Sequence, residues 1–238
     1  MTKILSIIIP AFNEAKSIEY LSQNMPKFSH FNLKIILIDD GSTDATAYLA
    51  HKVGFIVKSN WKHLGLGKTF KLGLFHALNE GSDIIVILDG DGQYNAKDIG
   101  RLIHPLTTKK ADFVIGNRFL STYNPEMNIQ KLLANKIISI FISKILLLLK
   151  ETYDVQSSFR AFNARFGRFL YKSLKGKYNY AQEMFILANL FNYRIKQIPI
   201  KCYKRLYGKS KLIKNPFLHM FRILSITLKT YFKIRFLH

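Results

Sequence analysis

Two aspartates separated by one glycine, Asp89 and Asp91, form the pattern in this 238-residue chain that points most directly to chemistry. They follow the apolar run 84–88, and residues two apart on an extended chain point the same way, so both carboxylates can face one site. With the amide oxygen of Gln93 they make a set of hard oxygen donors that suits Mg²⁺ or Mn²⁺ shared with phosphate oxygens. Gly90 leaves room for a diphosphate to approach the backbone. The alternative is a turn whose aspartates only cap the next helix, because Asp and Gly favour turns.

A second acidic pair, Asp39 and Asp40, follows the apolar run 34–38. The residues after Gly41 can cap the next helix, but capping does not account for two carboxylates at the tip of an apolar strand. A carboxylate there can bind ribose hydroxyls or a base edge, as acidic residues do in other nucleotide folds. This pair is therefore expected on the nucleotide side of the site.

The glycine-rich stretch 65–69 does not match a Walker A loop, because Lys62 stands where that motif needs glycine. We expect a turn into a helix, with Lys68 as a phosphate contact. His63 has no carboxylate neighbour in the sequence and is expected to be a surface or packing residue.

Alternating strand and helix patterns place these polar clusters at one edge of a sheet. Continuous apolar runs mark strands buried on both faces, and they cover residues 4–9, 34–38, 84–88 and 112–115. Helical patterns lie between them at 15–24, 45–50, 67–79 and 96–106. This order predicts a doubly wound α/β fold with a mostly parallel sheet, in which ligands bind beyond the carboxyl ends of the strands. The second part is expected to add helices at 129–149, 180–190 and 215–236 and strands within 154–163 and 194–200.

The charge of the chain is large and uneven. There are 36 Lys and Arg against 15 Asp and Glu, a net charge of +21, and residues 1–100 hold ten of each sign. The basic excess in residues 101–238 fits a polyanionic partner: nucleic acid, an anionic membrane or a phosphorylated substrate. The single cysteine, Cys202, excludes an intrachain disulfide and fits a reducing, cytosolic setting. The apolar stretch Ile137–Leu149 is too short to span a membrane and suits a buried or an interfacial helix.

Seven short motifs occur in one order along the chain: Pro10-Ala-Phe-Asn-Glu14, Asp39-Asp-Gly-Ser-Thr-Asp44, Asn60 with Gly65-Leu-Gly67, Asp89-Gly-Asp-Gly-Gln93, Gly116-Asn-Arg118, Asp154-Val-Gln-Ser-Ser-Phe-Arg160 and Arg205-Leu-Tyr-Gly-Lys-Ser-Lys211. In them the chain resembles family 2 glycosyltransferases of the GT-A fold, and most of all the dolichyl- or polyprenyl-phosphate mannosyltransferase and glucosyltransferase branch. The match covers about residues 4–211. It implies a GT-A domain at 1–211, with a nucleotide-sugar half at 1–118 and an acceptor half at 119–211. The remaining residues, 212–238, would form a membrane-facing amphipathic helix.

The resemblance also implies a role for each matching residue. The nucleotide sugar would be held by Pro10, Phe12, Glu14, Asp39, Asp40, Lys68, Asp89, Gly90 and Asp91. The metal ligands would be Asp89, Asp91 and Gln93, and the catalytic residues would be Asp89, Asp91 and Arg118. The phosphate of the lipid acceptor would be bound by Arg118, Lys131, Asn135, Arg205, Ser210 and Lys211. Arg160 would support the acceptor loop.

Three departures from the family pattern bear on these roles. The family usually has Arg where Lys131 stands and often Ser at Asn135, and lysine keeps the charge but loses the bidentate fork. The usual Ser-Gly-Phe-Arg is Ser-Ser-Phe-Arg here, so the turn cannot use the positive φ of a glycine at Ser158. The Gln-x-x-Arg-Trp signature of processive members is missing, which disfavours polymer synthesis.

Together these features predict a metal-dependent, inverting transfer of a hexose to polyprenyl phosphate at the cytoplasmic face of a membrane, with GDP-mannose expected ahead of UDP-glucose. A phosphate monoester is largely dianionic at neutral pH, so such an acceptor needs no strong general base. The basic amphipathic pattern of the C-terminal helix, with Phe and Leu on one face, favours docking to anionic lipid; its apolar residues are Phe217, Leu218, Phe221, Leu224, Tyr231 and Phe232.

Two alternatives stay open. One is a family 2 transferase that acts on a saccharide hydroxyl in cell-envelope glycan synthesis, or on a protein hydroxyl, and needs a general base. The other is a non-enzymatic nucleic-acid-binding protein, although acidic strand ends would repel a phosphate backbone.

Overall fold

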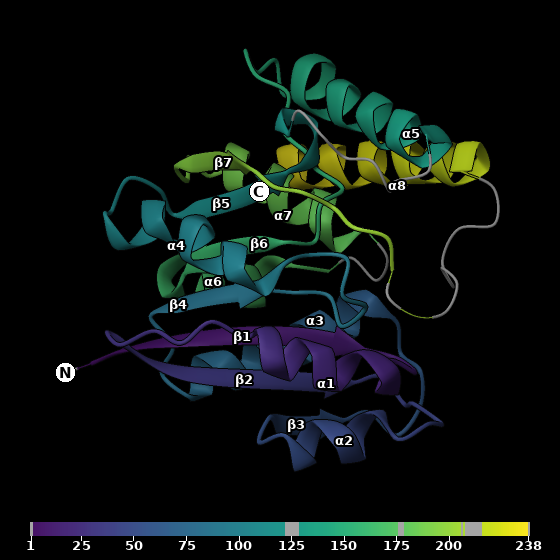
Figure 1. Ribbon diagram of the computed structural model, residues 1–238. Coiled ribbons are helices and arrows are strands. Elements are labelled where there is room, and N and C mark those ends of the chain that lie inside the picture. Colours follow the sequence, from purple (N-terminus) through teal and green to yellow (C-terminus); the bar gives the residue numbers. More distant parts are fainter. Residues whose placement is uncertain (1, 122–128, 176–178, 206, 208–215, 238) are drawn as a thin grey trace.

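A seven-stranded sheet runs through the molecule in the computed structural model, which describes residues 2–121, 129–175, 179–205, 207 and 216–237 (Figure 1). The strands are β1 (Lys3–Ala11), β2 (Phe31–Asp39), β3 (Ile56–Ser59), β4 (Ile84–Ile87), β5 (Phe113–Asn117), β6 (Arg160–Asn163) and β7 (Ile195–Pro199). Their order across the sheet is β3-β2-β1-β4-β6-β5-β7. β6 runs antiparallel to β4 and β5, and the other pairings are parallel. The predicted doubly wound, mostly parallel architecture is confirmed.

Helices cover both faces of this sheet because its central strands are apolar on both sides. In β1, Ile8 packs with Phe70 and Leu74 in one core, while Ile7 and Ile9 pack into the other. The first face carries α3 (Leu66–Asn79), α6 (Ala164–Ser173) and α7 (Tyr180–Leu190), and the second carries α1 (Ala15–Asn24), α2 (Thr46–Lys52) and α4 (Ile99–Thr107). Successive side chains of β1 enter cores on opposite faces of the sheet, so apolar residues follow one another along the strand.

Two further helices, α5 (Ile129–Ile140) and α8 (Pro216–Leu237), pack against each other at the end of the molecule farthest from β3 (Figure 1). α8 also packs against α7. Its buried residues, Met220, Ile223 and Ile234, belong to the same hydrophobic core as α3 and α6. The C-terminal helix is therefore integrated into the core of the fold.

The predicted helix at 129–149 is partly wrong. α5 ends at Ile140, a π-helical turn follows at Phe141–Leu146, and Leu148 has a φ of +53°. The hydroxyls of Ser139 and Ser143 accept hydrogen bonds from the backbone of Val155 and Tyr153. The helix thus changes its winding where it meets the 153–155 segment.

Two elements were not expected. β3 is a short edge strand of mixed polarity, and α6 carries arginines among its buried Phe166 and Leu170. β3 lacks the continuous apolar run that marked β1, β2, β4 and β5. α6 is amphipathic, with Phe166, Gly167 and Leu170 on its buried face.

Candidate active site

The two aspartates at the end of β4 lie in one acidic site. Asp89 Oδ2 accepts a hydrogen bond from the hydroxyl of Ser158. Asp91 is buried, and its Oδ1 accepts from the backbone N–H of Gln93 at 3.0 Å. Burial, and then the charge of Asp91, raise the pKa of Asp89 to about 7. The repulsion between the two carboxylates means that an added cation would stabilise the site.

A divalent cation fits this pair of residues. Two carboxylates supply hard oxygen donors, and Mg²⁺ or Mn²⁺ commonly completes such a set with water and substrate phosphates. Gln93, the expected third ligand, directs its side-chain Nε2 to the carbonyl oxygen of Tyr203 at 3.2 Å, and a role for its amide oxygen stays a prediction. Within the described part of the chain, no cluster of three His, Cys, Asp or Glu residues has the geometry of a metal site. The chain's own donors therefore fit a cation shared with a diphosphate rather than one enclosed by protein.

Arg205 joins the ends of β1 and β4. Its Nη1 lies 2.8 Å from Glu14 Oε1, and its Nη2 lies 2.8 Å from Asp91 Oδ2. The resemblance assigned Arg205 to the acceptor phosphate, whereas the structure brings it to carboxylates expected on the nucleotide side. Ser210 and Lys211, which belong to the same predicted motif, lie outside the described residues.

Asp40 holds the 60–65 loop in place. Its Oδ1 accepts hydrogen bonds from Asn60 Nδ2 at 2.7 Å and from the backbone of Leu64 at 3.0 Å, and its Oδ2 accepts from Gly65 N–H at 2.9 Å. The ring of His63 is also anchored, with Nδ1 2.8 Å from Asp40 Oδ2. The expectation that His63 lacks a carboxylate partner is therefore wrong. The expected contact between Asp40 and a nucleotide stays a prediction.

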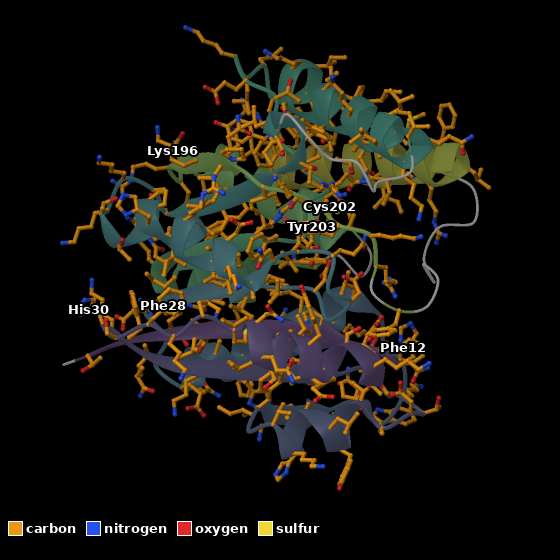
Figure 2. All side chains as sticks on the ribbon, viewed as in Figure 1. Phe12, Phe28, His30, Lys196, Cys202 and Tyr203 are labelled. Carbon is orange, nitrogen blue, oxygen red and sulfur yellow. The ribbon has the colours of Figure 1, made fainter. Side chains whose placement is uncertain are left out.

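An aromatic pair stands beside this loop. The rings of Phe12 and His63 have centroids 4.4 Å apart and are tilted by 32°. Phe12 lies near the carboxyl end of β1, and Figure 2 shows it on the same side of the molecule as the ends of the neighbouring strands. Asp39 accepts a hydrogen bond from Ser42 N–H at 3.1 Å, which closes the turn after β2. These residues form a polar and aromatic wall next to the acidic site.

Three glycines shape the loops. Gly41 has a φ of +77°, and a Cβ there would lie 2.6 Å from the backbone of Lys62. Gly65, with a φ of +88°, forms the expected turn into α3, and Lys68 is exposed in the first turn of that helix. At Gly90 a Cβ would lie 3.2 Å from the Pro10 carbonyl oxygen, so the missing side chain also serves the packing of the β1 and β4 ends.

Arg118, predicted to be catalytic, forms a buried ion pair with Asp154. Its Nε and Nη2 donate to the two carboxylate oxygens at 2.6 and 2.8 Å, and its backbone N–H adds a third bond at 3.1 Å. Much of its charge is thus offset inside the protein. Lys131 and Asn135 are half-buried and lie one turn apart on α5, so they can face the same side.

Arg160 anchors the loop before β6 to α7, and the expected role of that loop in binding the acceptor stays a prediction. Its guanidinium is fully buried and donates to the carbonyl oxygens of Ser157, Ala181 and Val155 at 2.6, 2.5 and 2.7 Å. Ser158 is not among the residues with positive φ, so the substitution of the usual glycine does not strain this turn. Its hydroxyl adds the contact with Asp89.

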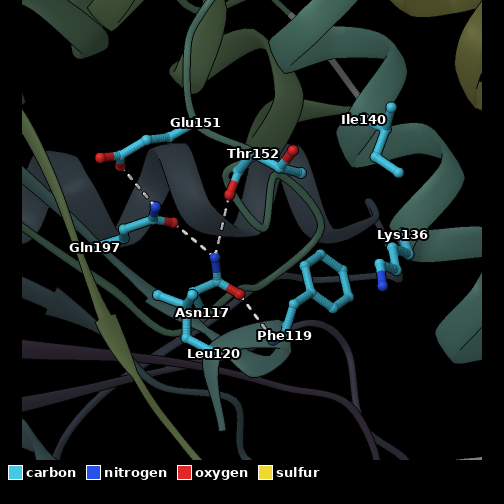
Figure 3. A pocket seen from close by; sticks show the side chains of 8 residues that line it. All are labelled: Asn117, Phe119, Leu120, Lys136, Ile140, Glu151, Thr152 and Gln197. Carbon is cyan, nitrogen blue, oxygen red and sulfur yellow. Dashed lines mark hydrogen bonds between the residues drawn. The ribbon is translucent and has the colours of Figure 1, made fainter.

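A pocket of about 520 Å³ opens between β5, β7 and α5 (Figure 3). One wall is a chain of hydrogen bonds in which Gln197 joins Glu151 at 3.0 Å to Asn117 at 2.6 Å. Figure 3 shows that the other wall is formed by Phe119 with Lys136 and Ile140 of α5. The two residues that flank Arg118 in the chain, Asn117 and Phe119, thus line this pocket.

Comparison with known proteins identifies the family. The model of glycosyl transferase family 2 matches residues 6–169, and the chain belongs to this family. It is a glycosyltransferase, which sets aside the non-enzymatic alternative.

Individual relatives narrow the comparison. The chain is 31% identical over 219 residues to "UDP-N-acetylglucosamine–dolichyl-phosphate N-acetylglucosaminyltransferase" of Methanococcus voltae, covering 84% of this chain and 85% of that protein. It is 24% identical over 218 residues to "dolichyl-phosphate beta-glucosyltransferase ALG5D" of Trichomonas vaginalis, covering 83% of this chain and 65% of that protein. A crystal structure of glucosyl-3-phosphoglycerate synthase from Mycobacterium tuberculosis shares the fold, with a TM-score of 0.70, 20% identity and coverage of 96% and 80% of the two chains.

Several contacts in this site had no signal in the sequence. Ser158 reaches Asp89 across 69 residues, and Arg205 reaches Glu14 across 191. The turn motifs located the carboxylates, but only the packing of the 202–205 segment over the end of β4 reveals which cation faces them. Such long-range pairings follow from tertiary packing rather than from local pattern.

Proposed function

We propose that this chain transfers a hexose from a uridine diphosphate sugar to a polyprenyl phosphate at a membrane surface. The observation that carries the proposal is the Asp89–Asp91 pair at the carboxyl end of β4 in a family 2 fold. The named relatives use dolichyl phosphate by their names, and one is named for a UDP sugar. GDP-mannose, the donor first expected, has no support among these names, so UDP-glucose and UDP-N-acetylglucosamine take precedence.

In this proposal the residues of the chain place two reactants and offset their charge. Phe12, Asp39 and Glu14 line the nucleotide side, and Asp89 with Asp91 holds a divalent cation that, when bound, neutralises the diphosphate leaving group. An oxygen of the acceptor phosphate attacks the anomeric carbon as the bond to the diphosphate breaks, which inverts that centre. The acceptor phosphate is already ionised, so no side chain needs to remove a proton. Placement and charge offset then supply the catalysis.

The acceptor half offers cations and apolar surface to a lipid phosphate. Neither α5 nor α8 contains an acidic residue. Exposed apolar side chains lie along α5 at Ile129, Leu133, Ile137 and Ile140, and along α8 at Leu218, Phe221, Phe232 and Phe236. Arg222, Lys229 and Lys233 are exposed on the same face of α8 as its phenylalanines. This two-helix surface is suited to peripheral docking on anionic lipid, such as that of a cytoplasmic leaflet. Among the described residues, no helix combines the length and the apolarity needed to cross a bilayer.

Transfer assays test the reaction. The protein is incubated with Mn²⁺ and labelled UDP-glucose, UDP-N-acetylglucosamine or GDP-mannose, together with either polyprenyl phosphate or a free oligosaccharide. We expect label from a UDP sugar in the lipid extract. Asp91→Asn should abolish transfer, whereas Asp98→Asn, a control carboxylate paired with Arg101, should not. Label that enters only the oligosaccharide would favour the saccharide-hydroxyl alternative instead.

Vesicle sedimentation tests the membrane surface separately. Replacing Phe221 and Phe232 together by serine should weaken binding to anionic vesicles by about tenfold or more, because each ring contributes roughly 1 kcal/mol of apolar burial. Tyr48→Ser is the matched control, since Tyr48 is 69% exposed on α2, away from this surface. Equal loss in the control and the double variant would remove the docking surface from the proposal.

A further inference from the structure

The guanidinium of Arg205 lies against the carboxylates that a donor complex would need. It bridges Glu14 and Asp91 with two contacts of 2.8 Å, and its side chain is only 21% exposed. The two carboxylates are 10% and 8% exposed. One cation thus serves acidic residues from two different strand ends.

Backbone hydrogen bonds hold the segment before Arg205 against the turn that carries Asp91. Tyr203 N–H donates to the carbonyl oxygen of Gln93 at 2.9 Å, and Gln93 Nε2 returns a bond to the carbonyl oxygen of Tyr203 at 3.2 Å. The turn that presents Asp91 therefore also anchors the segment that presents Arg205. Figure 2 shows Cys202 and Tyr203 near the middle of the molecule in this view. The pairing of Arg205 with Asp91 is thereby built into the loop structure.

Both oxygens of Asp91 are engaged in this arrangement. Oδ1 accepts from Gln93 N–H, and Oδ2 accepts from Arg205. A divalent cation on Asp91 would stand within a few ångströms of the guanidinium, and two cations that close repel each other strongly in a partly buried site. Metal coordination by Asp91 therefore competes with its ion pair to Arg205.

We propose that Arg205 is an exchangeable counter-ion, which neutralises Asp91 and Glu14 before a donor binds and is displaced from Asp91 by the metal and the diphosphate. This inference rests on the proposed metal-dependent use of a nucleotide sugar. The displaced guanidinium can then bind a phosphate. The role that the resemblance gave Arg205, a contact with the acceptor phosphate, describes this second position.

Binding of Mn²⁺ alone tests the exchange without any transfer reaction. Electron paramagnetic resonance measures free Mn²⁺ in a titration of the full-length protein without nucleotide. Arg205→Gln removes the competing cation and should bind Mn²⁺ about fivefold more tightly, the effect of a partly exposed ion pair. Arg205→Lys keeps the charge without the fork and should lie between the wild type and Arg205→Gln.

Two controls make the outcome specific. Arg101→Gln removes an arginine that pairs with Asp98 outside this site and should leave Mn²⁺ binding unchanged. When Asp91→Asn is added to both the wild type and Arg205→Gln, the two proteins should bind Mn²⁺ equally. Equal or weaker Mn²⁺ binding by Arg205→Gln would overturn the exchange, as would a lack of Mn²⁺ binding by every variant. If the wild type labels lipid but Arg205→Gln does not bind Mn²⁺ more tightly, this inference is wrong and the proposed function stands.

Discussion

Replacing Asp154 by leucine removes the carboxylate that faces the buried guanidinium of Arg118. Asp154 has no exposed surface, and the Arg118 side chain is 8% exposed. Three hydrogen bonds join the two residues, two from the guanidinium and one from the backbone N–H of Arg118. Burial works against the charge on Arg118, but the charge of Asp154 raises the pKa of Arg118 above its usual range. The pair is therefore a strongly coupled unit.

The size of the effect follows from this burial. Removing one partner of a buried ion pair costs about 3–5 kcal/mol, whereas replacing both partners by apolar residues of similar volume is often close to neutral. We expect Asp154→Leu and Arg118→Met each to lower the free energy of unfolding by about 3 kcal/mol or more. The double variant should lose about 1–2 kcal/mol, well below the sum of the single losses.

Urea unfolding of the four proteins at pH 7 provides the double-mutant cycle. A coupling free energy of about 3 kcal/mol or more is the expected result. Additive losses, or a cost below about 1 kcal/mol for Asp154→Leu, would refute the reasoning, because an exposed pair behaves in that way. If the double variant is stable and keeps its transfer rate, Arg118 is not needed to bind the acceptor phosphate.

Three further predictions concern pH and loop geometry. Hydrogen bonds from Arg194 lower the pKa of Asp112 to about 2, so its stabilising effect is present above about pH 4 and is lost as the pH falls from 4 to 2. In urea unfolding, Asp112→Asn should reduce the loss of unfolding free energy between pH 4 and pH 2 by about 1 kcal/mol, a value that allows for solvent screening at the exposed arginine. An unchanged pH profile would contradict the pairing. Burial raises the pKa of Asp89 to about 7, so the metal-free protein should lose stability as the pH rises from 4 to 7. Asp89→Asn should therefore be more stable than the wild type at pH 8, by about 2 kcal/mol after screening, but not at pH 4; an equal difference at both values would contradict this. Gly41→Ala should destabilise the protein by about 2 kcal/mol and Gly54→Ala by about 1 kcal/mol. Both glycines have a positive φ, but only at Gly41 would a Cβ lie 2.6 Å from a neighbouring loop. Equal losses in thermal unfolding would show that this close approach is unimportant.

The sequence was most informative where local pattern determines structure. Continuous apolar runs located β1, β2, β4 and β5, because a strand buried on both faces needs apolar side chains on both. The edge strand β3 was not predicted, because two of its four residues are exposed and it mixes apolar with polar side chains. The end of α5 at Ile140 depends on contacts with the 153–155 segment, which no helical periodicity records.

The site divides in the same way. Turn residues after the strands located Asp39, Asp89 and Asp91, because ligands of such sheets bind beyond the carboxyl ends of the strands. Sequence reasoning could not tell that Asp40 would hold a loop or that Arg205 would face Asp91. The partners of Asp40 lie 20 to 25 positions away in the sequence, and Arg205 lies 114 positions from Asp91. Both pairings depend on how the loops pack over the sheet.

The most direct test of the central claim is the ³¹P NMR spectrum of the lipid after reaction. Polyprenyl phosphate is incubated with the protein, Mn²⁺ and the UDP sugar that gives label in the lipid extract. Transfer to a phosphate oxygen converts the monoester into a phosphodiester, so the monoester resonance should decline and a diester resonance should replace it in equal amount, with no conversion by Asp91→Asn. A monoester signal that persists while the UDP sugar is consumed would show that the acceptor is not the lipid phosphate and would contradict the account.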